Sequence, residues 1–110
     1  MTVFNDFSAA YDWMFPWATR LSNEGTFFQD LFAAHGVRRV LDCACGTGMH
    51  PIQFARLGLQ AYGSDLSPAM IAQAESNARH SGVKIHLRVC SFTELTAHFT
   101  PRERFDAVIC

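Results

Sequence analysis

Long hydrophobic runs are missing from this sequence of 110 residues, which is 49% hydrophobic and 17% charged. Uncharged stretches such as 57–64 are far shorter than the roughly 20 apolar residues that a membrane-spanning helix needs. The first six residues contain no basic region followed by an apolar stretch, so we expect no secretory signal. An excess of one charge is also missing, because 9 Lys and Arg oppose 10 Asp and Glu. A net charge of −1 gives no electrostatic reason for nucleic acid or an anionic membrane to be the main partner.

Paired cysteines at zinc-site spacing are absent, although the sequence has four cysteines. A disulfide between Cys43 and Cys45 would be badly strained, and Cys90 and Cys110 each end an apolar run, as buried cysteines do. The five histidines are scattered, with no pair at ligand spacing, and we interpret all of them as non-catalytic. We therefore expect no metal site and a reduced, cytoplasmic protein.

Short apolar segments alternate with helical ones over most of the chain. Strands are expected at 37–43, 59–64, 83–90 and 105–110, with helices at 51–57, 67–81 and 93–98 between them. One helix in each gap indicates βαβ units, and the fold class is α/β with a Rossmann-like parallel sheet and flanking helices. The region 37–110 is expected to form this sheet domain.

Residues 1–36 are expected to form a helical cap before the sheet. The first 20 residues are rich in aromatic side chains, and Pro16 interrupts any regular helix there. Ser22 or Asn23 is predicted to cap a second helix that runs through Phe32 and stops at Gly36.

The last predicted strand, 105–110, is apolar on both faces, and no sequence follows that could cover it. A bare apolar edge strand favours association with another chain. We expect the 110 residues to be the front part of a larger domain, and we expect self-association through this strand.

A loop of small residues follows the first predicted strand and contains Gly46 and Gly48. Glycine permits a sharp turn and lets a ligand approach the backbone. Asp65 ends the next strand, so in a parallel sheet it lies beside this loop, where a carboxylate can accept hydrogen bonds from both hydroxyls of a ribose. The pattern predicts a site for a nucleoside-containing cofactor at the carboxyl ends of the strands.

The loop does not match the fingerprint of dinucleotide sites, G-x-G-x-x-G/A, because Ala44 and Met49 replace its first and last small residues. Asp42 beside the loop would repel a pyrophosphate, whereas it suits a positively charged ammonium group. This argues against NAD and favours a nucleoside that carries an amino acid.

The segment 41–48, Leu-Asp-Cys-Ala-Cys-Gly-Thr-Gly, resembles the first motif of class I S-adenosylmethionine-dependent methyltransferases. Three further segments resemble later motifs of that family in order: 64–67 with Met70, 90–95, and 105–110. The N-terminal Tyr11, Asp12 and Arg20 resemble the cap of small-molecule N-methyltransferases of the glycine/sarcosine type. The resemblance covers 37–110 well and implies the front part of a seven-stranded sheet.

The resemblance implies that S-adenosyl-L-methionine is the cofactor and assigns roles in binding it. The glycines allow close backbone approach, Asp42 faces the ammonium group, Asp65 the ribose, and an aromatic residue and an arginine reach back from the cap. Ser91 stands where the family has an acid or an amide. The implied cofactor-binding residues are Tyr11, Arg20, Asp42, Ala44, Gly46, Gly48, Asp65, Leu66, Met70, Ser91 and Phe92.

The expected function is therefore methyl transfer to a small-molecule acceptor, for which the N-terminal resemblance favours an amine. No catalytic residue can be named, because the family places its acceptor-binding residues after the fourth strand. Two alternatives stay open: a non-catalytic cofactor-binding or interaction module and, less favoured, an NAD-dependent oxidoreductase.

Overall fold

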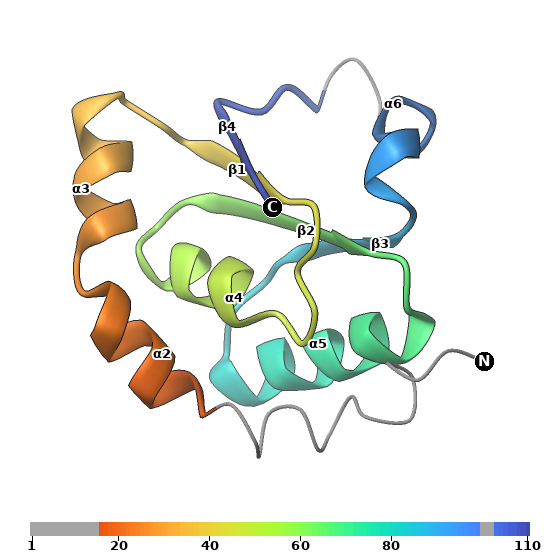
Figure 1. The fold of residues 1–110 in the computed structure, drawn as a ribbon, viewed down its shortest axis with the longest axis horizontal. Coiled ribbons are helices and arrows are strands. Elements are labelled where there is room, and N and C mark those ends of the chain that lie inside the picture. Colours follow the sequence, from red (N-terminus) through yellow and green to blue (C-terminus); the bar gives the residue numbers. More distant parts are fainter. Residues whose placement is uncertain (1–15, 100–102) are drawn as a thin grey trace.

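A computed structural model of the protein describes residues 16–99 and 103–110, and four parallel strands form its centre (Figure 1). They are β1 (Arg39–Asp42), β2 (Gln60–Asp65), β3 (His86–Val89) and β4 (Ala107–Ile109), in the spatial order β3-β2-β1-β4. This confirms the α/β class and the parallel sheet. The carboxyl ends of β1 and β2 are neighbours, since Leu41 pairs with Tyr62 and Asp42 with Gly63.

Helices connect the strands and precede the sheet. They are α2 (Trp17–Glu24), α3 (Phe27–Ala34), α4 (Met49–Arg56), α5 (Pro68–Ser81) and α6 (Leu95–His98), the last preceded by the 3₁₀ turn η1 (Phe92–Glu94). Figure 1 shows α4 and α5 packed on the sheet, with α2 and α3 beside them. Ser67 begins α5 as predicted, because its hydroxyl accepts a hydrogen bond from the Met70 backbone N–H and Pro68 follows it.

The start predicted for the second helix is wrong. Ser22 and Asn23 lie inside α2, which begins directly after Pro16, and a new helix, α3, begins after Thr26. Gly25, with φ of 59° and ψ of −131°, separates the two helices in a conformation that favours glycine. Pro16 therefore lies directly before the first residue of α2 and caps that helix.

Two apolar clusters lie on opposite faces of the sheet, because successive strand residues point to opposite sides. Val40 and Ala61 pack with Phe32 of α3 and Phe54 of α4. On the other face, Leu41 and Tyr62 pack with Cys43, Cys90 and Phe99, beside Leu95 of α6 and Phe105. Side chains packed on both faces of the sheet therefore hold the strands in place.

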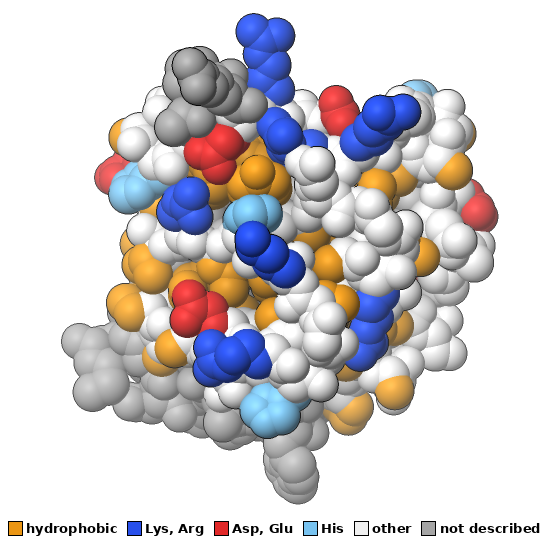
Figure 2. All heavy atoms as spheres, turned by 180° about the vertical axis from the view of Figure 1, so that it is seen from behind, with side chains coloured by type: hydrophobic (Ala, Val, Ile, Leu, Met, Phe, Trp, Pro, Cys, Tyr) orange, Lys and Arg blue, Asp and Glu red, His pale blue; other side chains and the backbone are white. Residues whose placement is uncertain are grey.

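Strand β4 is less buried than the sequence indicated. Val108 is 54% exposed, and Ala107 and Ile109 are half-buried on the other side of the strand. A hollow of about 300 Å³ beside Val108 is lined by Leu41, Leu95, Thr96, Phe99, Glu103 and Phe105. Figure 2 shows hydrophobic side chains lying between charged ones on the face of the molecule opposite to that of Figure 1.

Candidate functional site at the strand ends

Two aspartates end the central strands and bind backbone amides of the loops that follow. The Asp42 Oδ1 accepts a hydrogen bond from the Ala44 N–H at 3.1 Å. The Asp65 Oδ2 accepts from the Gly46 N–H at 2.9 Å, and its Oδ1 accepts from the Ser67 N–H at 2.9 Å. Asp65 thus ties the glycine loop, residues 43–48, to the start of α5. Each carboxylate oxygen has two lone pairs, so these bonds leave Asp65 acceptor capacity for hydroxyl groups.

Glycine is favoured at the two loop positions, Gly46 and Gly48, for different physical reasons. Both have left-handed backbones, with φ of 54° at Gly46 and 93° at Gly48. A Cβ at Gly48 would lie 3.1 Å from the Ala74 Cβ of α5, whereas a Cβ at Gly46 would have no atom within 4 Å. Gly48 is therefore needed for close packing of the loop on α5, and the space beside Gly46 is open.

Asp42 is held as a buried acid, with 4% of its surface exposed. Burial raises its pKa above the ordinary value, since a carboxylate loses hydration there, and the nearby Asp65 charge acts in the same direction. The hydrogen bond from Ala44 and the charge of His50 oppose this effect. The ionised form of Asp42 is therefore costly at this position, and carboxyl groups perturbed in this way cluster at functional sites.

Cys45 packs under the loop as a thiol. It is buried, and burial with the neighbouring carboxylates raises its pKa, so it stays protonated and unreactive. A Cβ at Gly63 would lie 2.9 Å from the Cys45 Sγ, which explains the glycine in the middle of β2.

The other sequence-predicted residues lie at varied positions. Leu66 is 67% exposed next to Asp65, whereas Met70 is buried in the first turn of α5. The Ser91 hydroxyl accepts a hydrogen bond from the Thr93 N–H and so caps η1, in which Phe92 is the first residue. Arg20 is half-buried on α2, and Tyr11 lies outside the described residues. The structure brings five of the predicted residues together at the strand ends: Asp42, Ala44, Gly46, Gly48 and Asp65. The cofactor-binding roles of all eleven residues stay predictions.

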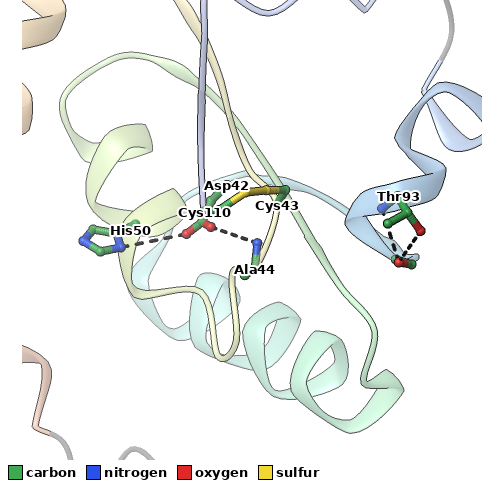
Figure 3. The surroundings of a disulfide bond; sticks show 7 residues. Asp42, Cys43, Ala44, His50, Thr93 and Cys110 are labelled. Carbon is green, nitrogen blue, oxygen red and sulfur yellow. Dashed lines mark hydrogen bonds and ion pairs between the residues drawn. A yellow bond between two sulfur atoms is a disulfide. The ribbon is translucent and has the colours of Figure 1, made fainter.

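The expectation of four free cysteines is wrong for two of them. Cys43 and Cys110 form a disulfide with a Cα–Cα distance of 5.2 Å, while Cys45 and Cys90 are free (Figure 3). The reason is strand register: Asp42 pairs with Ile109, so the next residues of the two parallel strands face each other. The sequence analysis did not predict this disulfide, because the two cysteines are 67 residues apart and meet only through the pairing of β1 with β4.

Sequence reasoning also missed two side chains that organise the site. His50, at the start of α4, lies between Glu24 and Asp42. Figure 3 shows its ring directed at Asp42, and its Nδ1 is 3.8 Å from the Asp42 Oδ2. Asn77 of α5 donates from Nδ2 to the Thr47 carbonyl oxygen at 3.0 Å and so fixes the glycine loop. Glu24 is 26 residues before His50, and Asn77 is 30 residues after Thr47, so no local spacing signals either contact.

Within 16–99 and 103–110, no group of three or more His, Cys, Asp or Glu side chains could hold a metal ion. Over the same ranges, no helix has the length and hydrophobicity to cross a membrane.

A family model described as a methyltransferase domain matches residues 40–110. Among curated proteins, the glycine/sarcosine N-methyltransferase of Aphanothece halophytica is 36% identical over 104 residues, 94% of this chain and 38% of that protein. The ubiquinone biosynthesis O-methyltransferase of Xanthomonas axonopodis is 40% identical over 72 residues, 66% of this chain and 29% of that protein. The chain thus spans less than two fifths of the length of either relative.

A solved structure shares the fold. An S-adenosylmethionine-dependent methyltransferase from Clostridium acetobutylicum superposes with a TM-score of 0.71 at 22% identity, covering 97% of this chain and 43% of that one. This likeness supports the Rossmann-like arrangement of the sheet and helices. The family match over residues 40–110 shows that the chain belongs to the methyltransferase-domain family.

Proposed function

We propose that this chain forms the cofactor-binding part of an S-adenosylmethionine-dependent methyltransferase that acts on a small amine. One observation carries the proposal: Asp42 and Asp65 end adjacent parallel strands on either side of an open glycine loop. The likeness to glycine/sarcosine N-methyltransferases extends over 94% of the chain, against 66% for the O-methyltransferase. It therefore includes the N-terminal segment, which favours an amine acceptor.

The donor set fits the proposed cofactor. Asp65 offers free lone pairs to ribose hydroxyls, and Asp42 offers negative charge to an ammonium group. The Asp42 charge beside the loop would repel a pyrophosphate, which disfavours a dinucleotide. The open space beside Gly46 leaves the backbone accessible to a ligand.

When bound, S-adenosylmethionine supplies a methyl group that is already activated on a positively charged sulfur. The part of the chain described here would bind and orient: Asp65 with the loop amides on one side, Asp42 on the other. Leu66, Met70, Ser91 and Phe92 would line the adenine end, and Ala44 would lie along the loop. Tyr11 and Arg20 would reach the site from the N-terminal region 1–36, which we propose as a cap on the cofactor-binding region 37–110.

Isothermal titration calorimetry of the intact gene product with S-adenosylhomocysteine tests this function. Asp65→Ala should weaken binding by about tenfold or more, because one hydrogen bond to a charged group contributes about 1.5–3 kcal/mol. Glu75→Ala is the matched control, since it removes an exposed carboxylate from α5. Undiminished binding by Asp65→Ala, or no binding by the unaltered protein, would contradict the proposal.

A methyl-transfer assay with glycine, sarcosine and other small amines tests the acceptor class. Formation of a methylated amine would confirm that the protein is an enzyme. Heat of S-adenosylhomocysteine binding without methylated product would support a non-catalytic binding module instead. Tight NADH binding with no response to S-adenosylhomocysteine would support an oxidoreductase. We infer a small molecule in preference to nucleic acid from the balanced net charge of −1.

We also propose that the exposed edge formed by β4 associates with a second copy of the chain. The exposed Val108 and the apolar hollow beside it support this proposal. Val108→Lys should lower the molecular mass measured by analytical ultracentrifugation from that of a dimer to that of a monomer. A monomer before the substitution would contradict it.

A further inference from the structure

His50 connects three parts of the fold near the proposed cofactor site. Its Nε2 lies 2.6 Å from the Glu24 Oε1 and 2.8 Å from Oε2, at the end of α2. Its Nδ1 lies 3.8 Å from the Asp42 Oδ2, at the end of β1 (Figure 3). The ring lies between Phe28 of α3 and Phe54 of α4, with centroid distances of 5.2 and 5.7 Å.

The chemistry of these contacts favours a charged imidazole. An ionised carboxylate only accepts hydrogen bonds, so Nε2 must carry a proton to bind Glu24. In a neutral ring Nδ1 would then direct its lone pair toward the Asp42 carboxylate, which is repulsive. A doubly protonated ring presents an N–H on each side and attracts both acids. Glu24 of α2 and Asp42 of β1 are the charged groups on its two sides, and Phe28 and Phe54 contribute no charge.

Burial explains why Asp42 needs this partner. Its side chain is 6% exposed and that of His50 is 19% exposed, so water screens the pair weakly. Burial raises the pKa of the Asp42 carboxyl and the nearby Asp65 charge adds to the rise, whereas the hydrogen bond from Ala44 and the positive charge of His50 act against it. The free Oδ2 of Asp42 is the atom that faces His50, while Oδ1 is engaged by Ala44.

We propose that His50 is a positioning residue that, anchored by Glu24, keeps the buried Asp42 carboxylate ionised and oriented to receive the ammonium group of the cofactor. This inference rests on the proposed function, in which Asp42 meets that ammonium group. It adds a distinct feature, because the acid side of the pH profile for cofactor binding is then set by a residue that does not itself contact the cofactor.

The direct test is the titration of the Asp42 side-chain carboxyl carbon by NMR in the ligand-free intact gene product. His50→Gln retains a donor for Glu24 and removes the charge, so the Asp42 titration should move to higher pH. His50→Lys retains a positive charge and should restore most of the shift. His98→Gln is the matched control, because it removes a histidine from a more exposed pair, with Glu94.

The second readout is calorimetry with S-adenosylhomocysteine between pH 5.5 and 8.5. His50→Gln should weaken binding about tenfold near pH 5.5 and by less than about twofold near pH 8.5, where Asp42 is ionised without help. A change of one pKa unit corresponds to a tenfold change in the ionised fraction below the titration midpoint. Equal weakening at both pH values would show a merely structural role and overturn the inference.

The two readouts separate the inference from the proposed function. An Asp42 titration that His50→Gln leaves unmoved overturns the role of His50, whatever ligand binds. A moved titration in a protein that binds no S-adenosylhomocysteine at any pH supports the coupling of His50 to Asp42 and overturns the proposed function.

Discussion

Asp42 shows at the scale of one residue how a site can oppose folding stability. Burial raises its pKa in the folded state, so the folded protein binds a proton more tightly than the unfolded chain does. Asp42 therefore favours folding least at high pH, and stability from this group is lost as the pH rises from about 4 through the folded pKa. The acid is retained at a cost in stability, which is consistent with a role in binding.

The substitution Asp42→Asn is therefore expected to stabilise the ligand-free protein and to weaken cofactor binding. Asp42→Asn keeps the Oδ1 that accepts from Ala44 and removes the buried charge. Urea unfolding at pH 8 should give a higher midpoint for the variant, with a smaller difference at pH 4.5. A lower midpoint at pH 8 would show that the charge itself supports the fold.

The loop glycines give a second prediction at this scale. Gly48→Ala should destabilise the protein more than Gly46→Ala, because both need a left-handed backbone but only Gly48 lacks room for a Cβ. The left-handed conformation costs about 1–2 kcal/mol, and overpacking adds about 1–3 kcal/mol. Urea unfolding of the two variants measures the difference, and equal losses would contradict the assignment of Gly48 to packing.

How far the site could be predicted differs between residues. Asp42 and Asp65 were predictable because parallel strand ends meet at one edge of the sheet, and the register of β1 and β2 confirms this. His50 and Glu24 were not, because their contact joins α4 to the end of a helix 26 residues earlier. Side chains that meet only through tertiary packing leave no periodic signal in the sequence.

At the scale of elements, the alternation of apolar strands and capped helices made the sheet and α5 predictable. The break between α2 and α3 was not, because Gly25 ends one helix and no strong cap starts the next. The edge strand β4 depends on Asp106, which precedes it and accepts hydrogen bonds from the backbone N–H groups of Arg38 and Arg39 at 2.8 and 2.9 Å. One exposed carboxylate therefore aligns β4 with β1.

These bonds lower the pKa of Asp106 in the folded state, so they predict a pH dependence for this element. A lowered folded pKa gives stability that is present above the ordinary value of 3.8 and lost as the pH falls through the folded pKa. Asp106→Asn should lower the urea midpoint at pH 7, and the difference should shrink toward pH 3. A constant difference across this range would show that the carboxylate charge is not involved.

At the scale of the whole molecule, the disulfide joins Cys43, the residue after the first strand β1, to Cys110, the residue after the last described strand β4. The disulfide leaves two of the four cysteines, Cys45 and Cys90, as free thiols. Alkylation of the unfolded protein before reduction, followed by mass spectrometry, should therefore label only Cys45 and Cys90. After reduction all four cysteines should be labelled, and four labels before reduction would contradict the disulfide.

The dual attachment of Asp65 has a consequence for binding kinetics. Because this carboxylate already links Gly46 to Ser67, both segments are ordered before any ligand arrives. Little conformational entropy is then lost on association, and encounter with the ligand requires no slow rearrangement of this edge. Stopped-flow traces should accordingly show a single phase whose rate rises linearly with ligand concentration.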